Sequence, residues 1–181
     1  WITRLPQRAG DHLFDHVHRN DRVLPIVVVC FSVGAALAAL FWARRFFTEM
    51  MSADEGNDLM REIAASVRSG ANAYLRQQFK WVAVVFAVVG LLLAYMSIYL
   101  GLATAFLPLA FLSGGFFSGL AGWLGMKTAT GASARTAAAA MTSLNGGLLI
   151  AFRSGAVMGL TVVGLGLLFV AGWFAILYWL G

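Results

Sequence analysis

The chain has 181 residues, of which 60% are hydrophobic and 12% are charged, and its mean hydropathy is +0.79. Soluble globular domains average about 45–50% apolar and about 25% charged residues, so this composition excludes a water-soluble domain and indicates a membrane protein. The net charge of +5 does not indicate nucleic-acid binding, because the basic residues flank apolar segments instead of clustering among aromatic side chains.

Residues 1–22 form a polar leader, which we expect to lie outside the cytoplasm. It contains all three histidines and two nearby aspartates: His12, His16, His18, Asp11 and Asp15. His12 and His16 would share a helical face and could bind a metal ion there. A solvated leader is the commoner explanation, so we assign no metal site. The chain begins with Trp1 and stops directly after an apolar run, so we expect it to be part of a longer protein.

Four segments are long and apolar enough to cross a hydrocarbon core, which takes roughly 20 residues. They lie at about 23–43, 81–100, 103–126 and 155–180. Nine basic residues fall between the first and second spans or between the third and fourth, and none falls in the short link between the second and third. The positive-inside rule therefore predicts cytoplasmic connections and both ends of the chain outside. Cys30, in the first span, is expected to be a small buried hydrophobe.

The connection 44–80 has the pattern of an amphipathic helix that runs into the second span. Apolar residues recur at helical spacing: Leu59, Ile63, Val67, Ala71, Tyr74 and Phe79. Acidic residues crowd its beginning and basic residues follow, an order that suits the helix dipole. A helix lying on the membrane surface is one interpretation. We favour a helix packed against other cytoplasmic helix extensions.

The second connection, 127–154, is rich in alanine and nearly uncharged, which predicts a helix surrounded by protein. Ser133 is a candidate N-cap for that helix. Lys127 and Arg153 are the charged residues nearest the cytoplasmic ends of the third and fourth spans. Either could touch an anionic substrate, but snorkelling to lipid headgroups is the commoner role of such residues.

Small residues recur in the third and fourth spans. They are Gly115, Ser118, Gly119 and Gly122 in the third, and Gly155, Gly159, Gly164, Gly166 and Gly172 in the fourth. Contact between helices in lipid depends on close packing, which small residues permit. These positions therefore predict a tight helical bundle, and they indicate no particular reaction.

Motifs that carry chemistry are scarce. No phosphate-binding GK[ST] triplet occurs, and "GLGLL" at Gly164 lacks the third glycine of a dinucleotide-binding loop. All eight acidic residues lie at or before Glu62, so the later spans offer no carboxylate for a proton relay. We assign no catalytic, cofactor-binding or metal-binding residue.

Three stretches resemble the membrane-integral pyrophosphatases, ion pumps driven by pyrophosphate hydrolysis. They are "MREIAASVRSGANAYLRQQFK" (60–80), "SGLAGWLGMKTATGASARTAAAA" (118–140) and "AFRSGAVMGLTVVGLGLL" (151–168). Together they cover most of residues 56–170 in the family's order and spacing. Ser69, Gln77 and Phe79 depart from the family pattern, as does "GASARTA".

The resemblance implies a homodimer with sixteen helices per subunit, in which these four spans belong to an outer ring. It implies a site for pyrophosphate and Mg²⁺ built by aspartates elsewhere in the polypeptide, with K⁺ or Na⁺ as further cofactors. The expected fold is an all-α polytopic membrane helical bundle with helical cytoplasmic extensions, contacting lipids and the remaining helices of the pump. The expected location is the bacterial inner membrane.

Two alternatives stay open at this point. One is a small non-enzymatic four-helix membrane protein that serves assembly or interaction. The other is a fragment of a secondary transporter, which would have polar or broken spans further on.

Overall fold

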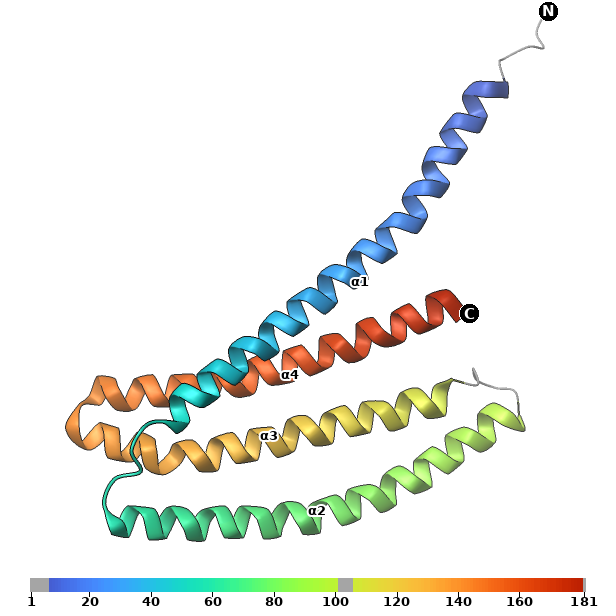
Figure 1. The fold of residues 1–181 in the computed structure, drawn as a ribbon. Helices are drawn as coiled ribbons and strands as arrows, with labels where there is room; N and C mark the ends of the chain where they lie inside the picture. Colours follow the sequence, from blue (N-terminus) through green and yellow to red (C-terminus); the bar gives the residue numbers. More distant parts are fainter. Residues whose placement is uncertain (1–6, 101–105, 181) are drawn as a thin grey trace, which may run out of the picture.

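The computed structural model describes the backbone of residues 7–100 and 106–180 and the side chains of 23–100 and 106–179. Within these residues it contains four helices and no strand: α1 (Gln7–Met51), α2 (Asp58–Ile98), α3 (Leu107–Thr142) and α4 (Leu144–Leu180). All four are long and apolar enough to cross a membrane, which confirms the predicted all-α polytopic bundle. Helices α2, α3 and α4 lie side by side in that order, and α1 packs against α4 at an angle (Figure 1).

All four described helices are much longer than the hydrocarbon core of a membrane is thick. At 1.5 Å per residue, the 41 residues of α2 extend about 60 Å, roughly twice the hydrocarbon core. The predicted amphipathic helix and the second span are thus one uninterrupted helix. The 36 residues of α3 likewise unite the third span with the alanine-rich connection. The bundle therefore continues beyond the membrane as helical extensions, as the sequence predicted.

The candidate N-cap at Ser133 is wrong, because α3 runs through this position. The Ser133 hydroxyl donates to the Thr130 carbonyl oxygen at 3.3 Å, a bond within the helix. Alanine is the best helix former, so nothing in this stretch favours a break. The chain turns at Ser143, whose backbone is extended (φ −156°, ψ 128°). Helix α4 begins at the next residue.

Helix α1 differs from the expectation in two respects. Its backbone is helical from Gln7, so the division between a leader 1–22 and the first span coincides with no break in the helix. Cys30 was expected to be buried but is exposed in this chain, because α4 covers only one side of α1. The side chains of the leader's histidines and aspartates lie outside the described residues.

Two of the glycines singled out in the third and fourth spans bring neighbouring helices into close contact. A Cβ on Gly164 of α4 would lie 2.8 Å from Leu40 Cγ and 3.1 Å from the Ala36 carbonyl oxygen of α1, and a Cβ on Gly115 of α3 would collide with the Phe86 ring of α2. The packing role predicted for the glycines thus holds at these two positions. Six others have no atom of this chain within 4 Å of that point: Gly119, Gly122, Gly155, Gly159, Gly166 and Gly172.

Candidate functional site at the junction of α1 and α2

The loop 52–57 joins α1 to α2 beside the turn from α3 to α4 (Figure 1). Several ion pairs involve acidic residues of this loop. Asn57 caps α2, its side-chain oxygen accepting from the Met60 N–H at 2.9 Å. Gly56 has φ +91°, which L side chains rarely adopt, and a Cβ there would lie 2.6 Å from Met60 Sδ. The loop conformation therefore requires glycine at position 56.

Arg135 of α3 holds this loop in place. Its Nε donates to the Ala53 carbonyl oxygen at 3.0 Å and its Nη1 to the Gly131 carbonyl oxygen at 2.6 Å. The same Nη1 lies 2.9 Å from Glu55 Oε1, and the Arg135 side chain is only 10% exposed. The planar guanidinium can serve several acceptors at once, which an ammonium group cannot match. Arg135 thus ties the α1–α2 loop to α3.

Glu55 lies between two arginines. Besides its contact with Arg135, its two carboxylate oxygens accept from Nη1 and Nη2 of Arg68, at 2.7 and 3.3 Å. The hydrogen bond from Arg68 is the main cause that lowers the pKa of Glu55, and the charge of Arg135 lowers it further against the opposing effect of burial. Asp54 beside it also has a lowered pKa, chiefly because Arg61 donates to it at 3.2 Å.

The lowered pKa of Glu55 predicts an acid-sensitive contribution to stability. Its usual pKa is 4.5, and a carboxyl group whose pKa is lower in the folded state stabilises fully above the unfolded value. That contribution is lost as the pH falls through the folded pKa. We expect the difference in thermal midpoint between wild type and Glu55→Gln to stay constant above pH 4.5 and to shrink below it. Circular dichroism melts at stepped pH measure this difference.

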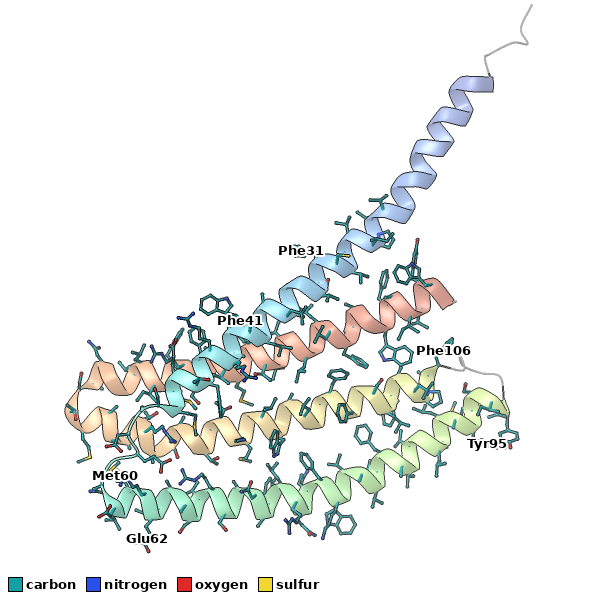
Figure 2. The ribbon with its side chains drawn as sticks, viewed as in Figure 1. Phe31, Phe41, Met60, Glu62, Tyr95 and Phe106 are labelled. Carbon is teal, nitrogen blue, oxygen red and sulfur yellow. The ribbon has the colours of Figure 1, made fainter. Side chains whose placement is uncertain are left out.

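Glu62→Gln serves as the matched control for this titration. Glu62 lies on α2, seven residues after Glu55, and points away from the bundle (Figure 2), so its replacement should change the thermal midpoint little. A midpoint difference for Glu55→Gln that does not change on acidification would contradict the ion-pair assignment.

A second ion-pair group joins α1 to α4. Glu49 accepts from Arg45 Nε at 3.2 Å, and its other carboxylate oxygen lies 3.2 Å from Arg153 Nη2. The expectation that Arg153 reaches for lipid headgroups is therefore corrected, because a carboxylate of α1 lies within its reach. Lys127 sits over the Trp123 ring, 5.2 Å from the centroid, in cation–π contact.

These contacts hold the loop 52–57 to α2 and α3, and they hold α1 to α4. Glu49, Asp54 and Glu55 all pair with arginine, and the described side chains contain no group of three or more His, Cys, Asp or Glu able to hold a metal ion. Metal sites for Mg²⁺ need carboxylate oxygens that are available to the ion. The junction fits helix positioning.

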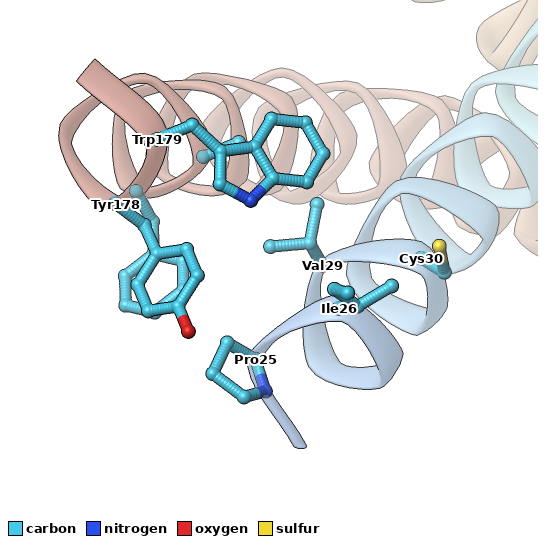
Figure 3. A pocket seen from close by; sticks show the side chains of 8 residues that line it. Pro25, Ile26, Val29, Cys30, Tyr178 and Trp179 are labelled. Atoms are coloured by element: carbon cyan, nitrogen blue, oxygen red, sulfur yellow. The ribbon is translucent and has the colours of Figure 1, made fainter. Parts of the chain in front are cut away.

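Cavities border the helices at several places. One of about 400 Å³ lies at the junction and has Asp54, Asn57 and Met60 among its lining residues. An apolar pocket of about 40 Å³ between α1 and α4 is lined by Pro25, Ile26, Val29, Cys30, Phe174, Ala175, Tyr178 and Trp179 (Figure 3). Its volume is about that of one water molecule, too small for a substrate. A larger groove of about 410 Å³ between α3 and α4 is bordered by small and apolar side chains, among them Ser118, Gly122 and Gly166.

Sequence reasoning missed the two central residues of the junction, Arg135 and Glu55. A usable signal was present, because an arginine inside an alanine-rich helix needs a partner when the helix is surrounded by protein. The acidic partner could not be chosen from the sequence, since 82 positions separate Arg135 from the loop carbonyl that it contacts.

Residues 19–180 match the family described as inorganic H⁺ pyrophosphatase. The chain is 55% identical over 143 residues to a putative K⁺-stimulated pyrophosphate-energized sodium pump of Bacteroides thetaiotaomicron, covering 79% of this chain and 20% of that protein. It is 40% identical over 134 residues to a K⁺-insensitive pyrophosphate-energized proton pump of Methanosarcina mazei, covering 74% and 19%. The chain spans about a fifth of the length of these curated relatives.

Proposed function

We propose, from the premise that the chain belongs to the inorganic H⁺ pyrophosphatase family, that it forms the outer-ring scaffold of a pyrophosphate-energised ion pump. The observation that carries this proposal is the family match over residues 19–180, together with 55% identity to a pyrophosphate-energized sodium pump. In the whole protein, pyrophosphate hydrolysis would drive H⁺ or Na⁺ across the membrane. The pump would work as a homodimer.

The scaffold role follows from the chemistry of the described residues. Hydrolysis of pyrophosphate needs a divalent cation to neutralise phosphate oxygens and to activate water. The carboxylates of the junction are committed to arginines, so they do not suit Mg²⁺. We therefore assign the Mg²⁺ and pyrophosphate site to other parts of the full-length protein, and any K⁺ or Na⁺ requirement with it.

The location and orientation follow from the same premise. The chain is a multi-pass integral membrane protein, and relatives such as the Bacteroides pump support the bacterial inner membrane. The arginine-rich junction would lie in the cytoplasm, as the positive-inside rule requires. Neither a separate four-helix assembly protein nor a secondary transporter finds support in the family match.

The test uses the full-length protein reconstituted in lipid vesicles. We expect Mg²⁺-dependent release of phosphate from pyrophosphate and, with it, transport of H⁺ or Na⁺. Glu49→Gln and Glu55→Gln should keep the rate within about threefold of wild type below their melting temperatures, because neither carboxylate would touch reacting groups. Phosphate release measures the hydrolysis of pyrophosphate, and ion flux in the same vesicles measures the transport.

The Mg²⁺ dependence separates the outcomes. A carboxylate that held the metal would raise the Mg²⁺ concentration needed for half-maximal rate when replaced by glutamine. Such a rise in either variant would overturn the scaffold assignment of the junction. Absence of pyrophosphate hydrolysis in the wild type would overturn the proposed function itself.

A further inference from the structure

One face of α2 remains uncovered outside the membrane. Leu59, Ile63, Val67 and Tyr74, here called the α2 stripe, follow one another at intervals of four or seven residues and so share a helical face. Their exposed fractions lie between 46% and 63%. Among the described helices, α2 packs only against α3. The stripe is therefore an unpartnered apolar face.

The stripe is distinct from both the packed side and the polar side of α2. Ala64 is 2% exposed on the packed side, where Met60 is directed toward the junction (Figure 2). Glu62 points away from the bundle in the same view, and the helical spacing puts Arg76 on the same side of α2. The α2 stripe lies beside the face that packs against α3. Together the two faces form an apolar surface that is wider than α3 alone can cover.

Lipid does not suit the stripe as its cover. Residues 58–80 precede the apolar span that begins at Trp81, and α2 continues from one to the other without a break. The segment therefore projects about 30 Å beyond the span, alongside the extension of α3 (Figure 1). A helix lying on the membrane surface would have to bend at this boundary. Apolar side chains exposed to water there cost about 25 cal/mol per Å².

Gly70 lies at the centre of the stripe, between Val67 and Tyr74. No atom of this chain lies within 4 Å of the point where its Cβ would be. Glycine in a helix interior costs about 1 kcal/mol relative to alanine, and nothing in this chain uses the space that it leaves. Missing side chains at a helix surface allow another backbone to approach closely.

We propose that the α2 stripe is covered by an amphipathic helix from the remaining part of the same pump polypeptide, which crosses α2 nearest Gly70. The occupant comes from the same polypeptide because the curated relatives are about five times as long as this chain and share the segment that bears the stripe. The inference rests on the proposed function. It adds a specific contact surface outside the membrane.

The test is site-directed spin labelling of the full-length protein in vesicles. In a Cys30→Ser background, single cysteines replace Ile63 or Val67 in the stripe, and Ala65→Cys on the polar side serves as the control. Oxygen enters lipid, a water-soluble nickel chelate enters only water, and neither enters a packed protein interface. We expect stripe labels to collide with both agents about tenfold less often than the label at position 65.

Each other result would overturn the proposal. Access of the nickel chelate equal to that at position 65 means an open stripe, and access of oxygen alone means lipid. Spin–spin broadening between labels on two copies means that a second subunit covers the stripe. Thiol alkylation of unlabelled Ile63→Cys repeats the measurement with a smaller probe, should the nitroxide disturb assembly. None of these readouts depends on pyrophosphate hydrolysis, so failure here is distinguishable from failure of the proposed function.

Discussion

Replacing Arg135 with alanine is expected to lower the free energy of unfolding of the full-length protein by about 3 kcal/mol. The change removes two hydrogen bonds to backbone carbonyls and one of the two arginines that pair with Glu55. It leaves the Ala53 carbonyl without this donor and detaches the α1–α2 loop from α3. Thermal melts of the purified protein, followed by circular dichroism, measure the loss.

Two further variants test whether the loss of stability comes from the contacts of Arg135. Arg135→Lys keeps the charge but cannot serve all three acceptors, so its loss should be intermediate. Arg61→Ala removes an arginine whose side chain is 54% exposed and whose partner Asp54 is 74% exposed, and it should change the melt little. Equal effects of Arg135→Ala and Arg61→Ala would mean that the Arg135 contacts do not hold the loop.

Replacing Gly164 with alanine is the second large effect that we expect. The added Cβ would lie 2.8 Å from Leu40 Cγ and 3.1 Å from the Ala36 carbonyl oxygen, and the backbone atom cannot turn aside as a side-chain tip can. Helix α4 must move away from α1, at a cost of about 2 kcal/mol. The loss arises although alanine forms helices better than glycine. The melting temperature of the full-length protein reports it.

Gly172→Ala is the matched control, since it makes the same chemical change in the same helix. No atom of this chain lies within 4 Å of its Cβ position, so this substitution should be neutral or slightly stabilising. If both substitutions lowered the melting temperature equally, contacts with other parts of the pump would explain the loss at Gly164. The prediction that the close approach of α1 and α4 causes the loss would then be wrong.

The helices could be predicted because their signals are local. Runs of roughly twenty apolar residues gave the four spans, and the helical spacing from Leu59 to Tyr74 gave the extension of α2. The end of α3 was misplaced, because a serine followed by alanines resembles a helix start as well as a helix interior. The extended backbone of Ser143 shows that the helix ends there and not at Ser133.

The junction could be predicted only in part, because its contacts join distant positions. The sequence showed that the acids gather before Glu62 but could not show that Glu55 meets Arg135. The choice between Gly164 and Gly159 as a contact depends on the rotation of α4 against α1. That rotation is set by packing of the whole bundle, so small residues predict closeness without naming the partner.

The turn at Ser143 has a consequence for motion. With a single non-helical residue between α3 and α4, the two helices cannot separate at this end. Any displacement of α4 would be transmitted directly to α3, and the pair is therefore expected to move as one hairpin.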